Sequence, residues 1–195
     1  VDNPLLGPNG SAAIFGPQKI APKNRSPQTK LNSLIDQLDR NLAHLSRILE
    51  KETGKKNIAK WPGSGAAGGF PLSFCSILDA KMANGSKLVL KLINFDKLKG
   101  ADIVITCEGR CDNQTLHGKG PYEVCKMMKG SHIIMLSGGI ESFDVEKGML
   151  NAGANIVSAL ADGPSTLENS IQRTDELLQR SAFRYVYSYL RTKYV

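Results

Sequence analysis

The 195-residue sequence is poor in aromatic residues, which make up 6% of it and include a single Trp. Bases of nucleic acids stack on aromatic side chains, and only the tyrosines near the carboxyl terminus lie among basic residues. The formal net charge of +7 is then the sole argument for a nucleic-acid partner, and we expect none. No apolar run approaches the length that crosses a bilayer, so we expect no membrane contact and a soluble, cytoplasmic protein.

The sequence also lacks the cysteine spacing of a zinc site. Cys107 and Cys111 are separated by three residues, and neither Cys75 nor Cys125 completes a second pair. The pattern predicts free thiols in a reducing cytosol. A signal peptide is absent as well, and because the chain starts at Val1 instead of Met, we expect it to be part of a longer protein.

The first half of the chain is rich in Gly and Pro. Residues 1–22 hold Asn-Pro, Asn-Gly and two Gly-Pro pairs, which predict loops and turns and leave open whether residues 3–10 bind a ligand or only link elements. Ser26 and Pro27 then form a typical helix start. Apolar residues at helical spacing from Leu31 to Leu49 predict a long amphipathic helix that ends at Thr53-Gly54.

A second glycine-rich segment, residues 61–69, precedes the apolar run from Phe70 to Leu78. Uncovered amides before a helix start could hold a phosphate or carboxylate. Small residues could equally allow a buried helix to pack closely, and the spacing leaves both interpretations open. After the Asn84-Gly85 turn, Leu88 to Ile93 fits either a helix or a strand.

From residue 102 the pattern becomes regular. Three short apolar runs alternate with helical patterns, which predicts a β-α-β-α-β-α series and a parallel sheet. The predicted strands are residues 102–106, 132–137 and 155–160, and the predicted helices are residues 121–128, 143–151 and 166–189. Loops follow the strands at residues 108–120, 137–139 and 162–164, and because such loops share one sheet edge, we expect them to form a ligand-binding rim.

The first of these loops carries the charged residues. Glu108, Arg110, Asp112 and Lys119 supply the cations and carboxylates that phosphoryl transfer requires. The alternative is a surface network in which Arg110 pairs with Glu108 or Asp112. His117 is a general base by residue type, but no nucleophile accompanies it, so a ligand contact or a structural role fits better.

Four sequence blocks in the same order resemble the bacterial glycerate kinase family of the two-domain type, in its carboxyl-terminal half. The blocks are residues 3–10, 15–19, 62–69 and 108–121. The resemblance implies transfer of the γ-phosphoryl group of ATP to D-glycerate with Mg²⁺, giving 2-phosphoglycerate in the best-known branch. It also implies an α/β fold in which residues 1–95 end an inserted α/β domain and residues 96–195 form the returning βαβαβα half of a flavodoxin-like sheet.

The resemblance implies roles for individual residues. Arg110 and Lys119 would bind the anions of glycerate and ATP, and Asp112 or Glu108 would hold Mg²⁺ or act as the base. Further ligand contacts are expected at Gln114, Thr115, Gly63, Gly65, Gly68, Gly69, Asn3 and Lys19.

The sequence departs from the family pattern at Cys107, Cys111, Ile20, Gly120 and residues 71–73. Cys107 stands where glycine is usual and restricts the backbone of the loop. A non-catalytic, ligand-binding fragment of the same fold is the alternative function. Half a sheet would expose apolar surface, so a homodimer or a pairing with the amino-terminal half is expected.

Overall fold

The computed structural model describes residues 2–20 and 28–194 and contains two compact units, residues 1–83 and 84–195. The predicted domain boundary between residues 95 and 96 concerns the full-length fold and stays a prediction. Of the helices in the described ranges, none combines the length and the apolar composition that crossing a bilayer requires.

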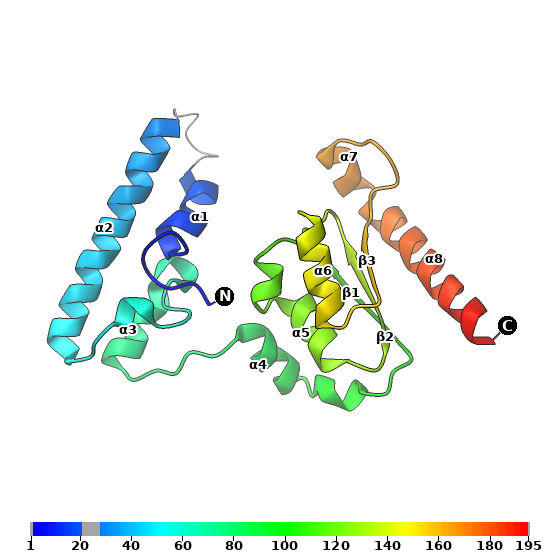
Figure 1. Cartoon of the computed structure of the whole chain (residues 1–195), viewed down its shortest axis with the longest axis horizontal. Coiled ribbons are helices and arrows are strands. Elements are labelled where there is room, and N and C mark those ends of the chain that lie inside the picture. The colour runs from blue at the N-terminus through cyan, green and yellow to red at the C-terminus, as the bar shows by residue number, and fades with distance from the viewer. Residues whose placement is uncertain (1, 21–27, 195) are drawn as a thin grey trace. The chain divides into compact units, whose positions relative to one another are not determined.

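The regular elements of the first unit, in its described residues, are all helices (Figure 1). It contains α1 (Ser11–Ile20), α2 (Gln28–Thr53), α3 (Phe70–Ile77) and two short 3₁₀ helices, η1 (Ile58–Lys60) and η2 (Ala66–Gly68). The long helix and its end before Gly54, whose φ is +70°, are confirmed, whereas the predicted start at Ser26 and Pro27 lies outside the described residues. The hydrophobic core of the first unit contains Leu5, Leu49, Ile58 and Leu72.

The prediction of loop and turns for residues 1–22 is wrong for α1, which is helical although Pro17 lies inside it. The helix is buried at its start, where Ser11 and Ala12 are 3% and 4% exposed. A Cβ atom at Gly16 would lie 3.2 Å from Ile35 Cγ1, so this glycine lets α1 pack closely against α2. Packing between the helices therefore outweighs the low helix propensity of Gly and Pro.

The second unit is the predicted α/β part. It runs α4 (Gly85–Leu92), η3 (Phe95–Leu98), β1 (Ile103–Glu108), η4 (Thr115–His117), α5 (Gly120–Met127), β2 (His132–Ser137), α6 (Phe143–Ala152), β3 (Ile156–Ala159), α7 (Leu167–Gln172) and α8 (Thr174–Tyr194). The strands form a parallel sheet in the order β1-β2-β3, as predicted, with Ile103 opposite His132 and Ile134 opposite Ile156.

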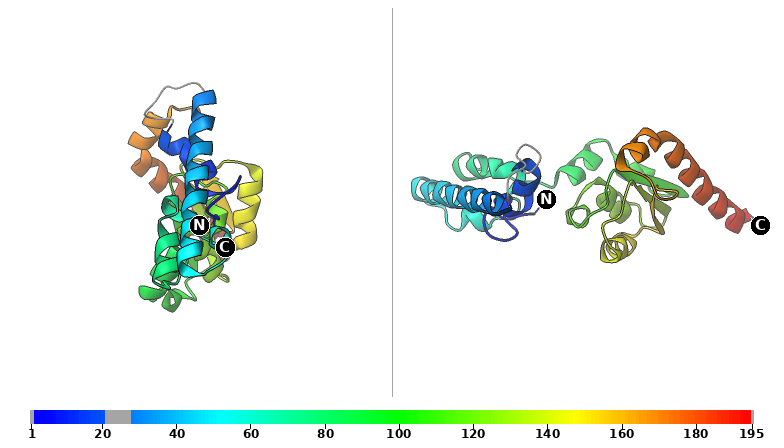
Figure 2. Two further views of the ribbon diagram at one scale, coloured as in Figure 1. Left: turned by 90° about the vertical axis from the view of Figure 1, so that its left-hand side faces the viewer. Right: turned by 90° about the horizontal axis from the view of Figure 1, so that it is seen from above.

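Helices cover the sheet on both faces (Figures 1 and 2). Ile133 to Leu136 of β2 are 0% exposed, and because successive side chains of a strand point to opposite faces, both faces of β2 are buried. The α5 and α6 helices build the main core on one face, around Met128, Met135 and Met149. On the other face α8 leaves β1 partly open, so Ile105 is 43% exposed.

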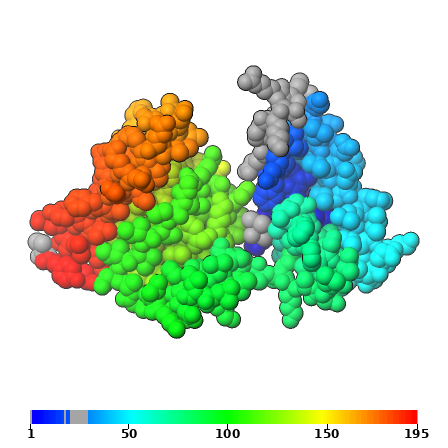
Figure 3. Space-filling view, turned by 180° about the vertical axis from the view of Figure 1, so that it is seen from behind, coloured from blue at the N-terminus to red at the C-terminus, as the bar shows by residue number. Residues whose placement is uncertain are grey.

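The carboxyl-terminal helix is divided in two, although the sequence predicts one helix from residue 166 to 189. It breaks at Arg173, and α7 and α8 lie together at one side of the unit (orange to red in Figure 3). The Arg173 guanidinium lies 3.1 Å from Asp162 Oδ2, and Arg180 approaches the same oxygen to 2.7 Å. Both arginines therefore tie α7 and α8 to the loop that follows β3.

The Asn84-Gly85 segment is a helix start rather than a hairpin turn. The Asn84 side chain accepts a hydrogen bond from the Lys87 amide at 3.0 Å, which caps α4 and settles the open choice in favour of a helix. Asn84 Nδ2 also donates to the Gly118 carbonyl at 3.2 Å. This contact joins α4 to the charged loop after β1.

Candidate active site

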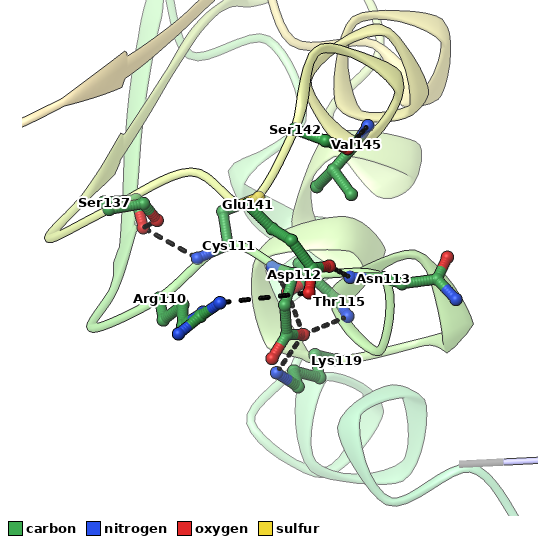
Figure 4. A network of polar contacts seen from close by, with 11 residues as sticks. Arg110, Cys111, Asp112, Asn113, Thr115, Lys119, Ser137, Glu141, Ser142 and Val145 are labelled. Carbon is green, nitrogen blue, oxygen red and sulfur yellow. Dashed lines mark hydrogen bonds and ion pairs between the residues drawn. The ribbon is translucent and has the colours of Figure 1, made fainter. Parts of the chain in front are cut away.

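Hydrogen bonds donated by backbone amides join the loop that follows β1 to the loop that follows β2. The Gly138 amide donates to the Glu108 carbonyl at 3.2 Å, and the Cys111 amide donates to the Ser137 hydroxyl and the Gly139 carbonyl, both at 2.9 Å (Figure 4). A Cβ atom at residue 138 would lie 2.5 Å from the Gly109 carbonyl oxygen. Only glycine allows the two loops to approach this closely.

Four side chains of the first loop form one polar cluster, and Figure 4 shows three of them. Lys119 Nζ donates to Asp112 Oδ1 at 2.8 Å and lies 3.8 Å from Glu108 Oε2. Asp112 Oδ1 also accepts from the Thr115 amide and hydroxyl, at 3.1 and 3.3 Å. The predicted residues Glu108, Asp112, Thr115 and Lys119 are therefore in mutual reach.

The two carboxyl groups of this cluster have pKa values shifted in opposite directions. Burial raises the pKa of Glu108, and the Thr115 hydroxyl and the Lys119 charge offset this only in part. Burial would raise the pKa of Asp112 as well, but the hydrogen bond and charge of Lys119, together with Thr115, outweigh it and lower the pKa. Near neutral pH, Glu108 is the better proton acceptor and Asp112 the more persistent anion.

Glu108 carries the strongest sign of a missing partner. Its Oε1 is buried and has no hydrogen-bond partner among the described residues, while its side chain as a whole is 13% exposed. A buried oxygen without a partner costs free energy and is unusual in a folded protein. Such an oxygen is suited to a ligand that arrives with a donor or a cation.

We expect Glu108→Gln to stabilise the second unit more at pH 7 than at acid pH. A carboxyl group whose pKa is raised on folding stabilises the folded state fully below its unfolded value, ordinarily 4.5, and this stability is lost as the pH rises through the folded value. Glutamine does not ionise, so the variant does not lose this stability as the pH rises. Urea denaturation at about pH 4 and about pH 7 measures the difference, and Glu168→Gln, an exposed glutamate of α7, is the control. A stability difference that does not grow with pH would contradict this assignment.

Arg110 does not pair with Glu108 or Asp112, so that alternative is wrong. Its NH2 lies 3.9 Å from Glu141 Oε1, and its side chain is 70% exposed. Glu141 Oε2 accepts from the Asn113 amide at 2.8 Å. Glu141 therefore braces the loop and leaves the guanidinium open to a ligand. The sequence analysis missed this residue, although its place just after the Gly138-Gly139 pair could have indicated it.

A pocket of about 700 Å³ lies at the carboxyl ends of all three strands. Glu108, Gly109 and Arg110 line it from the β1 loop, Gly138 and Gly139 from the β2 loop, and Leu160 and Ala161 after β3. The three loops thus meet at one sheet edge as predicted, and ligand binding there stays a prediction. The outer wall of the pocket comes from α7 and α8, for which the sequence analysis predicts a helix but no part in the site.

The predicted site residues of the first unit form a separate group. The Asn3 carbonyl accepts from the Gly65 amide at 2.9 Å, and the Asn3 side chain donates to the Asn9 carbonyl. Lys19 and Gly68 line a cavity of about 640 Å³. Gly63, Gly68 and Gly69 have φ angles between +80° and +88°. Within the described residues of this unit, these glycines serve the local backbone, and a ligand role for them stays a prediction.

Gly65 permits a close backbone contact, and we expect Gly65→Ala to destabilise the first unit by about 1–3 kcal/mol. A Cβ atom there would lie 2.1 Å from the Pro4 carbonyl oxygen, which cannot move without losing the Asn3 contact. Gly85→Ala, where nothing lies within 4 Å, is the matched control. Chemical denaturation followed by circular dichroism compares the two, and equal stabilities would contradict a packing role for Gly65.

The remaining predicted residues have structural contacts. The Gln114 carbonyl accepts from the His117 amide at 3.1 Å, and both belong to the turn that ends at Gly118. All four cysteines are free thiols, as predicted, and burial raises the pKa of Cys107 and raises that of Cys111 to about 11. Thiol chemistry therefore has no support. Among the described residues, no group of three or more His, Cys, Asp or Glu side chains could hold a metal ion.

The known proteins that this chain resembles in sequence include several glycerate kinases. The model of the glycerate kinase family matches residues 1–189. A glycerate kinase from Halalkalibacterium halodurans is 38% identical over 186 residues, covering 93% of this chain and 46% of that protein. A glycerate 2-kinase from Escherichia coli is 35% identical over 143 residues, covering 72% of this chain and 35% of that protein.

The fold comparison agrees. A solved structure named for glycerate kinase 2 of Salmonella typhimurium LT2 superposes with a TM-score of 0.61 and 25% identity, over all of this chain and 47% of that one. The chain spans about half the length of the curated relatives it matches.

Proposed function

Because the chain belongs to the glycerate kinase family, we propose that it carries the phosphoryl-transfer residues of an ATP-dependent kinase of D-glycerate, with 2-phosphoglycerate as the product. The single observation that carries the proposal is the Lys119 ammonium between the carboxylates of Asp112 and Glu108, at the carboxyl end of β1. Phosphoryl transfer depends on fixed charges that stabilise the transferring group, and this cluster holds them in place. The free thiols agree with a cytoplasmic location.

Each residue of the cluster has a role that follows from its charge near neutral pH. Lys119 and Arg110 stabilise the negative charge of the transferring phosphoryl group and of the glycerate carboxylate. Glu108, with its raised pKa, accepts the proton of the attacking hydroxyl, whose oxygen bonds to the γ-phosphorus while ADP leaves. Asp112 stays ionised and orients Lys119.

Magnesium fits this donor set in part. The ion takes oxygen ligands and commonly binds one or two carboxylates together with substrate phosphates, so three protein ligands are not needed. Asp112 Oδ2 is the oxygen that would hold it, because Lys119 engages Oδ1 and the unpartnered Oε1 of Glu108 accepts the proton. When bound, the ion would neutralise charge on the phosphate oxygens.

A coupled assay of ADP release in the presence of D-glycerate tests the proposal. It is run on this chain alone and on a hybrid enzyme, formed by producing the chain together with the amino-terminal half of the Halalkalibacterium halodurans relative, of which the chain covers 46%. We expect glycerate-dependent ADP release from the hybrid enzyme.

The control is the same relative produced as two separate halves. If these halves reconstitute activity while the hybrid assembles without phosphorylating glycerate, the proposal is wrong. Binding of ATP without turnover would then favour the alternative function, a non-catalytic ligand-binding module.

A further inference from the structure

The Asn84 side chain uses both ends of its amide within the second unit. Its Oδ1 accepts a hydrogen bond from the Lys87 amide at 3.0 Å, and its Nδ2 donates to the Gly118 carbonyl at 3.2 Å. A backbone N–H can only donate and a carbonyl can only accept, so the two partners fix the orientation of this side chain. Asn84 is therefore bonded at the same time to the start of α4 and to the charged loop after β1.

Helix capping explains only one of these two bonds. Serine and aspartate cap helices about as well as asparagine, because each has a side-chain oxygen that accepts from the backbone. Serine has no second polar atom, and the second polar atom of aspartate is an acceptor. Of the three, only asparagine can cap α4 and also donate to Gly118 from a separate atom.

The backbone at Gly118 fits closely against Asn84. Gly118 has a φ of +90°, which favours glycine, and a Cβ atom at this position would lie 2.2 Å from Asn84 Nδ2. It would also lie 3.2 Å from Glu123 Oε1, in the first turn of α5. A side chain at residue 118 would therefore displace the Asn84 amide from the carbonyl that it binds.

The bond from Asn84 reaches the backbone of Lys119 directly. The Gly118 carbonyl and the Lys119 amide belong to one planar peptide group, and in a trans peptide they point in opposite directions. Asn84 holds the carbonyl, while the Lys119 amide donates to the Thr115 carbonyl on the other side, at 3.4 Å. This second bond is long, so the contact with Asn84 has a large share in fixing the peptide.

Resting on the proposed function, in which Lys119 stabilises the transferring phosphoryl group, we propose that Asn84 is a positioning residue for Lys119. By holding the peptide between Gly118 and Lys119, it fixes the point from which the Lys119 side chain reaches Asp112. Asn84 is also the first residue of the second unit, so the chain enters this unit at the residue that holds Lys119. Asn84 acts through Lys119 and not on a substrate.

Amide hydrogen exchange of the full chain, followed by NMR, tests the contact without requiring activity. Asn84→Ser keeps an oxygen that caps α4 and lacks the donor for Gly118. We expect the amides of His117, Gly118 and Lys119 to exchange about two- to tenfold faster in this variant, the effect of one neutral hydrogen bond, while the amides of α4 exchange as before.

Lys87→Ala is the matched control for the exchange experiment. It removes an exposed ion pair between α4 and α5, with Glu123, and leaves both bonds of Asn84 in place. Its exchange should match that of the unchanged chain. If Asn84→Ser exchanges like Lys87→Ala at residues 117–119, Asn84 is a helix cap only and the proposal is overturned.

The hybrid enzyme tests whether Asn84 acts through Lys119. We expect Asn84→Ser to lower kcat about tenfold and to leave the KM values for ATP and D-glycerate unchanged, because the group that it misplaces acts in the transition state. In a Lys119→Ala background the same change should lower kcat no further, since no lysine is left to position. A loss of kcat by the same factor in both backgrounds would show a general structural effect and overturn the proposal.

The outcomes also separate this inference from the proposed function. Faster exchange at residues 117–119 in Asn84→Ser, in a chain whose hybrid enzyme does not phosphorylate glycerate, would support the hold on Lys119 and refute the kinase proposal. Phosphorylation of glycerate with the same kcat before and after Asn84→Ser would support the kinase proposal and refute the positioning role.

Discussion

Lys119→Ala is expected to lower the kcat of the hybrid enzyme by about 10²–10³-fold, the usual cost of removing one fixed group that stabilises transition-state charge. Lys119 is the cation that both Asp112 and Glu108 approach. Its ion pairs are partly exposed, so the loss of stability should be only about 0–1 kcal/mol. Steady-state kinetics and thermal unfolding of the same preparation measure the two effects.

Lys87→Ala is the matched control for Lys119→Ala. Lys87 also lies 3.8 Å from a glutamate, Glu123, but its own side chain is 59% exposed and it lines no part of the 700 Å³ pocket. Its kcat should match that of the unchanged enzyme. A folded Lys119→Ala variant that turns over at the rate of Lys87→Ala would remove Lys119 from the mechanism.

Asp112→Asn is expected to lower kcat by about 10²–10⁴-fold while keeping the loop folded. Asparagine retains the oxygen that accepts from the Thr115 amide and hydroxyl, and it removes only the charge that holds Lys119 and would hold Mg²⁺. Asp112→Ala removes both the accepting oxygen and the charge, so it should also lower the unfolding temperature. The comparison separates the chemical role of the carboxylate from its structural role.

The control for Asp112→Asn is Asp144→Asn, an exposed aspartate in the first turn of α6. If Asp112→Asn has normal turnover, or if its activity falls only in proportion to its folded fraction, Asp112 is a structural residue.

The parallel sheet could be predicted from the sequence because its strands are dense apolar runs and every loop after them is polar. Residues 132–137, the predicted second strand, are β2 residue for residue. The charged cluster was also predictable, because Glu108 to Lys119 are close in sequence and the turn at Thr115 brings them together.

Other features depend on contacts that local sequence does not contain. The α1 helix is favoured by the close approach of Gly16 to Ile35, which lies in the next helix, α2. The break at Arg173 reflects its pairing with Asp162, and the pocket wall follows from that break. Arg110 pairs with Glu141 because the β1 and β2 loops meet in space.

The close approach of Gly109 and Gly138 has a mechanical consequence. Hydrogen bonds from the amides of Gly138, Cys111 and Glu141 and the contact between Gly109 and Gly138 join the two loops, so neither can shift without carrying the other. Adjustment to an arriving ligand must then come from side chains such as Arg110, which is 70% exposed. The β1 and β2 loops are therefore preorganised, so a ligand that binds at them would not have to order a loop.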